Sequence, residues 1–186
     1  MEKFPGGDTT TCLESFIDTN GRSIQASTSH MLGQNFSKMF GIQFEDRNKE
    51  KQFAWQTSWG FTTRSIGVFI MHHSDDKGVV LTPRVAIHQV VIVPIYMKKI
   101  PREEMNDECD KIAAILKKAG VRVKIDDRDN YTPGFRYNHW EIRGIPLRIE
   151  LGPKDLEEKK VTLVQRYDGA KSEHPLEGLG EHVTKL

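Results

Sequence analysis

The 186-residue sequence has only two cysteines, Cys12 and Cys109, and they form no CxxC pair. Two isolated thiols cannot build a disulfide framework or a zinc site by themselves, so both are expected to be reduced. Charge of one sign is also lacking, because 27 Lys and Arg stand against 26 Asp and Glu, a net charge of +1. That balance excludes a protein that coats DNA through a broad cationic excess, although it allows a local basic face.

Long hydrophobic runs are missing too. No apolar stretch approaches the roughly 20 residues that cross a bilayer, so no transmembrane helix and no membrane partner are expected. The first residues lack a basic flank followed by an apolar core, which predicts a cytoplasmic protein. With 37% hydrophobic and 28% charged residues, the composition is that of a globular protein of one large or two small domains.

The first half of the chain alternates β-rich segments with turn signals. Asn20-Gly21 supplies positive φ at low cost, which is typical of a hairpin turn. Thr62 can cap a helix that begins near Arg64, with apolar side chains from Ile66 to Ile70 buried behind it. The other predicted elements are strands at residues 10–17, 22–29 and 53–59, a helix within residues 31–44, and a charged loop at 46–52.

The second half of the chain differs from the first, because predicted strands there are combined with a long amphipathic helix. Residues 89–95 form a β-branched run that suits a strand buried on both faces. Residues 103–119 place Met105, Cys109 and Leu116 on one side of a 3.6-residue period, which predicts an amphipathic helix ending at Gly120. The further predictions are strands at 121–125, 146–151 and 161–166, a loop at 126–138, a mixed segment at 139–143, and a helix from about residue 176. This order predicts an α/β domain at 88–186 and a separate domain at 1–87.

Two polar clusters in the first half are candidates for binding. Thr28 and His30 share one face of a strand and can converge on a ligand, although a half-buried polar strand end is the commoner explanation of this pattern. Gly60 beside Trp59 permits close backbone approach, and Arg64 at a helix start offers a planar fork for a phosphate. A surface ion pair is the alternative for Arg64.

The second half interleaves aromatic and basic residues. Aromatic residues among Arg136, Arg143 and Arg148 suit unstacked RNA bases, which are held by stacking and edge hydrogen bonds. The carboxylate of Glu141 can accept from a base edge. An aromatic core with a charged rim is the alternative.

Several long stretches, in order, closely resemble prolyl-tRNA synthetases of the eukaryotic and archaeal type. In the first half these are Glu2–Asp8, Thr28–Phe40 and Ser58–Gly67. In the second half they are Pro83–Ala86, Pro133–Glu141 and Leu151–Asp155. The resemblance implies an α+β architecture: part of a class II antiparallel active-site sheet, then an α/β anticodon-binding domain with a mixed sheet.

The resemblance also implies an activity and the residues that serve it. The family activates L-proline with ATP to prolyl-adenylate and transfers it to tRNA(Pro). Gln25, Thr28, Thr62 and Arg64 match ATP-binding residues, with Gln25 also near Mg²⁺, and His30, Trp59 and Gly60 match the proline pocket. Arg64 corresponds to the arginine of the third class II motif. Glu141, Arg148, Lys154 and Lys171 match residues that read the guanines of the proline anticodon.

The departures from the family bear on activity. The first two class II motifs and the proline-selecting Thr-x-Glu loop lie, in the family, upstream of the segment that begins at Glu2. The family's zinc-binding extension is not matched, so no zinc is expected. The sequence therefore predicts a catalytic fragment that is inactive alone, with an incomplete version of the family's homodimer interface. The alternatives are a non-catalytic anticodon-binding module and a partner-stabilising paralogue without either activity.

Overall fold

A computed structural model describes residues 3–18 and 20–186, and the chain folds into two compact units, Met1–His72 and His73–Leu186. Glu2, which opens the first matching stretch, lies outside the described residues. Within the described residues, no helix is long and apolar enough to cross a bilayer.

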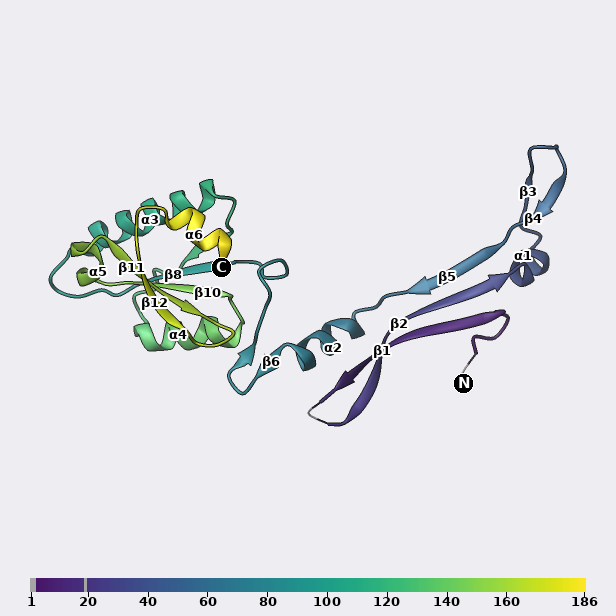
Figure 1. Ribbon diagram of the computed structural model, residues 1–186, viewed down its shortest axis with the longest axis horizontal. Coiled ribbons are helices and arrows are strands. Elements are labelled where there is room, and N and C mark those ends of the chain that lie inside the picture. Colours follow the sequence, from purple (N-terminus) through teal and green to yellow (C-terminus); the bar gives the residue numbers. More distant parts are fainter. Residues whose placement is uncertain (1–2, 19) are drawn as a thin grey trace. The chain divides into compact units, whose positions relative to one another are not determined.

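The first unit is built on an antiparallel sheet in the order β1-β2-β5 (Figure 1). The predicted hairpin is present. In its turn Gly21 has a φ of 66°, and the Arg22 amide donates a hydrogen bond to the Asn20 side chain. The elements are β1 (Thr9–Ile17), β2 (Arg22–Gly33), α1 (Asn35–Phe40), β3 (Gln43–Glu45), β4 (Lys51–Phe53), β5 (Gln56–Gly60) and α2 (Arg64–His72).

The core of the first unit is small. Ile17, Leu32 and Val68 are its buried hydrophobic residues, while Ile66 and Ile70 on α2 are 60% and 44% exposed. The prediction that Ile66 and Ile70 are buried is therefore wrong for this chain, because no described element covers their side of the helix. The helix predicted within residues 31–44 is confined to α1, since β2 continues to Gly33.

The second unit is a five-stranded mixed sheet in the order β12-β11-β10-β8-β9, preceded by a short β6–β7 hairpin. β8 pairs in parallel with both β9 and β10, whereas β11 and β12 are antiparallel. The elements are β6 (Ser74–Asp75), β7 (Gly78–Val79), β8 (Val90–Pro94), α3 (Arg102–Lys118), β9 (Val123–Ile125), α4 (Pro133–Ile142), β10 (Leu147–Leu151), α5 (Pro153–Glu157), β11 (Lys160–Gln165), β12 (Lys171–Pro175) and α6 (Leu179–Lys185).

The two crossover helices lie on opposite faces of this sheet. The chain leaves β8 through α3 to reach β9, then returns through α4 to β10 on the other side of β8, and right-handed crossovers in opposite directions place their helices on opposite faces. α3 and α6 therefore cover one face, where Ile92, Leu116 and Leu163 are fully buried or nearly so. α4 packs over Val91 and Val93 on the other face (Figure 1).

Two predictions for the second unit are wrong. Residues 126–138, predicted as a loop, run into α4, which begins where the Thr132 side chain accepts from the Phe135 amide and Pro133 occupies the first turn. Residues 171–175, not predicted as a strand, form β12 on the edge of the sheet. The compact units divide after His72. The guanidinium of Arg122 donates to the carbonyls of Pro83, Ala86 and Ile87, which ties these residues to the second unit.

Candidate functional site

A cavity of about 250 Å³ lies in the first unit, between the sheet and the start of α2. It is lined by all seven residues predicted to bind ATP or proline: Gln25, Thr28, His30, Trp59, Gly60, Thr62 and Arg64. Sheet register explains this convergence, because Thr28 pairs with Gly60 and His30 pairs with Ser58 across β2 and β5. Residues that are far apart in the sequence therefore line the same cavity.

Hydrogen bonds fix part of the lining. The Gln25 side-chain amide donates to the Thr28 hydroxyl at 2.7 Å, and Nδ1 of His30 lies 2.9 Å from the Thr10 hydroxyl. The Phe4 ring, which also lines the cavity, lies 4.5 Å from the His30 ring. These contacts orient one side of the cavity as a shallow, partly aromatic surface.

Arg64 begins α2 as predicted, and its amide donates to the Thr62 hydroxyl at 3.3 Å. Its guanidinium forms no ion pair among the described residues, so the surface ion pair considered for Arg64 is not what holds it. It is the one guanidinium or ammonium group in the described lining of the cavity. The arrangement offers a single strong anion-binding group beside several hydroxyls.

The cavity contains oxygen donors that suit Mg²⁺ only in part. The Gln25 side chain has a carbonyl, and neighbouring threonine and serine residues carry hydroxyls, but the described lining contains no carboxylate. Mg²⁺ in proteins is held by one or two carboxylates together with substrate phosphates and water. In this chain Gln25 fits as one ligand of an ion held mainly by phosphates. Within the described part of the chain, no three His, Cys, Asp or Glu residues are grouped to hold a metal.

A second candidate surface lies on the α4 face of the five-stranded sheet. α4 covers β8, and the polar residues of the neighbouring strands point to the same side, because Arg148 pairs in register with Val91. A small cavity of about 30 Å³ is lined by both Glu141 and Arg148. Arg148 lies over the Tyr137 ring at 4.3 Å and bonds to Glu150, which also accepts from Lys171 at 2.8 Å.

Three of the four predicted anticodon residues, Glu141, Arg148 and Lys171, thus come together on this face. Lys154 is exposed on α5, and no hydrogen bond joins it to the other three within the described residues. Arg136 does not belong to this surface, although its sequence context suggested RNA contact. Its side chain is buried, and it donates to the carbonyls of Asp126 at 2.6 Å and Pro94 at 2.7 Å.

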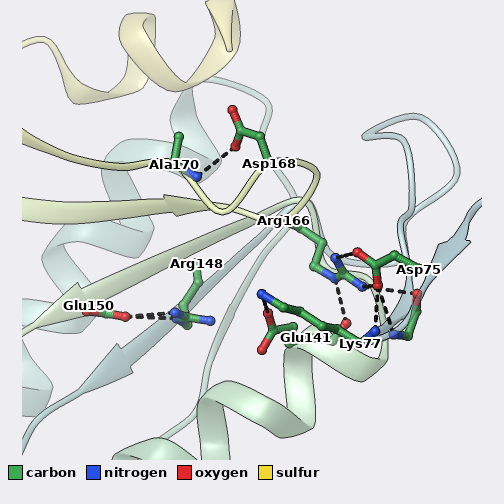
Figure 2. A network of polar contacts seen from close by, with 9 residues as sticks. Asp75, Lys77, Glu141, Arg148, Glu150, Arg166, Asp168 and Ala170 are labelled. Atoms are coloured by element: carbon green, nitrogen blue, oxygen red, sulfur yellow. Dashed lines mark hydrogen bonds and ion pairs between the residues drawn. The ribbon is translucent and has the colours of Figure 1, made fainter.

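A polar network that the sequence did not predict supports Glu141 (Figure 2). The Arg166 guanidinium donates to the Glu141 carbonyl at 2.9 Å and to both carboxylate oxygens of Asp75, at 2.6 and 2.7 Å. The ammonium of Lys77 lies 3.5 Å from the Glu141 carboxylate. The Arg166 hydrogen bonds hold the pKa of Asp75 well below its usual range. The β6–β7 hairpin is therefore fastened beside the helix that carries Glu141.

Burial also shapes the electrostatics of this face. Burial, followed by the charge of Glu150, raises the pKa of Tyr137 to about 12. The neutral Tyr137 ring lies beneath the Arg148 guanidinium, in the arrangement of a cation–π contact. No signal in the linear sequence singled out Glu150 or Arg166, because each acts through partners brought in by strand register or by the hairpin.

Comparison with known proteins finds relatives of the whole chain and a family match within its second unit. Residues 89–186 match the family described as the anticodon binding domain. The whole chain is 50% identical to the cytoplasmic proline-tRNA ligase of Arabidopsis thaliana and spans 35% of its length. It is 47% identical to the bifunctional glutamate/proline-tRNA ligase of Drosophila melanogaster, spanning 11% of that protein.

Solved structures give the same result. Prolyl-tRNA synthetase from Cryptosporidium parvum, complexed with L-proline and AMP, is 56% identical, with a TM-score of 0.92 over 100% of this chain and 40% of that one. A second structure of that enzyme is complexed with halofuginone and AMPPNP. The α+β architecture predicted from the resemblance is confirmed. The chain belongs to the anticodon binding domain family, and along its whole length it is similar to prolyl-tRNA synthetases, which are ligases.

Proposed function

We propose that this chain contributes to the attachment of L-proline to tRNA(Pro), with ATP and proline bound by the first unit and the anticodon bound by the second. One observation carries the proposal: the seven residues matched to ATP and proline binding, from Gln25 to Arg64, line a single cavity. A random set of surface positions would be scattered over the unit. The complexes of the related C. parvum enzyme with L-proline and AMP support the assignment of ligands.

In this proposal the cavity binds and orients the reactants and supplies no nucleophile. The proline carboxylate oxygen attacks the α-phosphorus of ATP, a P–O bond forms, and pyrophosphate leaves. Arg64 neutralises charge on the phosphates, with Gln25, Thr28 and Thr62 around the nucleotide, whereas His30, Trp59 and Gly60 shape the proline pocket. The Gln25 side-chain carbonyl would be one ligand of Mg²⁺, which would supply further charge neutralisation on the phosphates when bound. Such a reaction depends on positioning and charge stabilisation.

The charge of the cavity limits what this chain does alone. A nucleoside triphosphate carries several negative charges, whereas the described lining supplies one guanidinium, that of Arg64. Transition-state stabilisation requires more preorganised donors than that. We therefore expect no detectable proline-dependent exchange of pyrophosphate into ATP by the 186-residue chain. Robust exchange would show that no further groups are needed.

Nucleotide binding can be tested without turnover. Titration of the chain with AMPPNP is expected to show weak binding that Arg64→Ala reduces by roughly tenfold or more, because a hydrogen bond between charged groups is lost. Arg47→Ala serves as the matched control, since Arg47 lies in the exposed β3–β4 turn and does not line the cavity. Equal affinities for all three proteins would argue against a nucleotide site at Arg64.

The second unit is proposed to bind the anticodon of tRNA(Pro) through Glu141, Arg148, Lys154 and Lys171. The grouping of Glu141, Arg148 and Lys171 on one face of the sheet supports this, and Lys154 rests on its match to the family alone. An anticodon stem–loop RNA with the two guanines should bind more tightly than one in which adenines replace them. Glu141→Ala and Lys154→Ala should each reduce that preference.

A matched control is available on the opposite face. Lys117 is exposed on α3, so Lys117→Ala removes one positive charge far from the proposed surface and should leave the preference unchanged. Binding that ignores the anticodon sequence would contradict the assignment of these residues.

A purely anticodon-binding module is the second candidate. It is favoured by the contrast between the large buried core of the second unit and the few buried side chains of the first. Anticodon-dependent RNA binding without any AMPPNP binding would select this alternative.

A further inference from the structure

Glu150 on β10 is a buried carboxylate shared by two of the proposed anticodon residues. Its Oε1 accepts from Nε of Arg148 at 3.1 Å and from Nη2 at 2.9 Å, and its Oε2 accepts from Nζ of Lys171 at 2.8 Å. The side chain of Glu150 is 9% exposed, compared with 17% for Arg148 and 62% for Lys171. Figure 2 shows Glu150 and Arg148 facing one another along the strand.

Strand register produces this arrangement. Arg148 pairs with Val164 on β11, and Val164 pairs with Lys171 on β12, so Arg148 and Lys171 share a row and a face two strands apart. Two interstrand spacings separate their backbones by roughly 10 Å. Glu150, two residues from Arg148 on the same face, draws both cationic groups toward one point.

The Arg148 guanidinium is held on two sides. Its Nε and Nη2 face Glu150, and its Cζ lies 4.3 Å from the centre of the Tyr137 ring. Among the described residues nothing further bonds to Nη1 or to the outer hydrogen of Nη2, so both can donate to a ligand. An arginine with a fixed plane can present two donors to the O6 and N7 acceptors of a guanine, whereas a freely rotating one gains less from the same contact.

We propose that Glu150 is a positioning residue for anticodon recognition, which orients Arg148 and Lys171 toward base edges and offsets part of their charge. This inference rests on the proposed RNA-binding function of the second unit. Glu150 is too buried to be a principal RNA contact, so it acts through its two partners. Removing its charge is therefore expected to change specificity and non-specific affinity in opposite directions.

The test is Glu150→Gln in the full 186-residue chain, with binding measured to stem–loops that carry guanines or adenines in the anticodon. Gln keeps the size of the side chain but cannot accept through its amide nitrogen from Lys171. The preference for the guanine RNA is expected to fall roughly tenfold, the order of one well-oriented base contact. Affinity for the adenine RNA should rise, and the slope of log K against log salt should steepen by about 0.7, the value of one additional phosphate contact to a single strand.

Two further variants separate the causes. Glu173→Gln makes the same charge change on β12, where Glu173 pairs with Lys160 at 2.8 Å rather than with a proposed anticodon residue, and should leave the preference unchanged. Glu150→Asp keeps the charge but shortens the reach, so it should lower the preference while the salt slope stays that of the wild type. Hydrogen exchange of β10 amides verifies that each variant is folded.

The outcomes distinguish this inference from the proposed function. If the wild-type chain shows no preference for the guanine RNA, the proposed anticodon binding itself fails. If the wild type discriminates and Glu150→Gln discriminates equally, the positioning role alone is wrong. A loss of affinity for both RNAs in equal proportion, with a folded variant, would also overturn it, because a positioning residue must affect the two RNAs differently.

Discussion

Gly144 is the position where a single methyl group should most clearly separate backbone strain from packing. It follows α4 with a φ of 70°, and its carbonyl accepts from the Leu81 amide at 3.1 Å. A Cβ placed on it would lie 2.7 Å from the carbonyl carbon of Val79 and closer still to the carbonyl oxygen. Those are backbone atoms of the β6–β7 hairpin, so they cannot move without displacing it.

The matched control is Gly120, which ends α3 with a φ of 82° but has open space around its Cβ position. Gly120→Ala introduces mainly the strain of the left-handed conformation, about 1–2 kcal/mol of the free energy of unfolding. Gly144→Ala introduces the same strain plus an overpacking cost of about 1–3 kcal/mol, or a total of about 2–5 kcal/mol. The difference between the two variants therefore isolates the packing of the hairpin against α4.

Native-state hydrogen exchange read by mass spectrometry suits this comparison, because it reports each unit separately. Amides of β10 should lose more protection in Gly144→Ala than in Gly120→Ala, and amides of residues 74–81 should lose protection in Gly144→Ala alone. If the two variants lost the same protection everywhere, the hairpin would not be packed on α4 in solution and the reasoning would be refuted.

Four further outcomes are expected. Cys12, which is exposed, should react quickly with a thiol reagent, whereas Cys109 should react only on unfolding, because burial raises its pKa to about 12. Asp75→Asn should lower the urea midpoint of the second unit at pH 7; since the pKa of Asp75 is depressed in the folded state, the difference from the wild type should close as the pH falls below about 4. Amides of β1 and β2 should exchange faster than those of β8, and uniform slow exchange would contradict the small core of the first unit. A chain of residues 88–186 should unfold at a lower urea concentration than one of residues 73–186, because it lacks Asp75, whose carboxylate pairs with the buried guanidinium of Arg166. Equal urea midpoints would argue against a stabilising role of Asp75.

Local patterns predicted the elements whose own sequences specify which residues are buried. The apolar positions of α3 place Met105, Cys109 and Leu116 in the core as the 3.6-residue period required, and every residue of β8 is buried as its β-branched run indicated. These elements pack against large apolar areas on the faces that their sequences specify. For them, composition and periodicity contain the information that determines the structure.

Elements stabilised by distant partners could not be found in this way. β12 consists of Lys171–Pro175, which lacks alternating apolar residues and becomes a strand because β11 offers it a paired edge. α4 did have a local signal, the Thr132 cap followed by Pro133, but its polar sequence and the charge of Arg136 concealed how much of it is buried. A buried arginine that bonds to backbone carbonyls resembles a surface arginine in the sequence.

The candidate sites divide along the same line. Local patterns made several residues of the first cavity candidates, and the resemblance named all seven. The pairing of β2 with β5 then explains why they converge. By contrast, the bond between Arg166 and Asp75 joins positions that are 91 residues apart, and no spacing rule connects them. Motif matching finds groups that contact ligands, whereas it passes over the groups that hold them in place.

The hairpin of residues 74–79 shows that such supporting groups also affect where the domain boundary lies. The sequence changes character near residue 87, but Asp75 and Lys77 lie before that point and contact Arg166 and Glu141 beyond it. Arg166 reaches Asp75 and the Glu141 carbonyl with one guanidinium, so the position of α4 depends on a segment outside residues 89–186. Because the Arg166 side chain is only 4% exposed, water cannot fully replace Asp75 as its partner. The hairpin of residues 74–79 is therefore a structural part of the proposed anticodon surface, and changes in this hairpin should alter RNA recognition as well as stability.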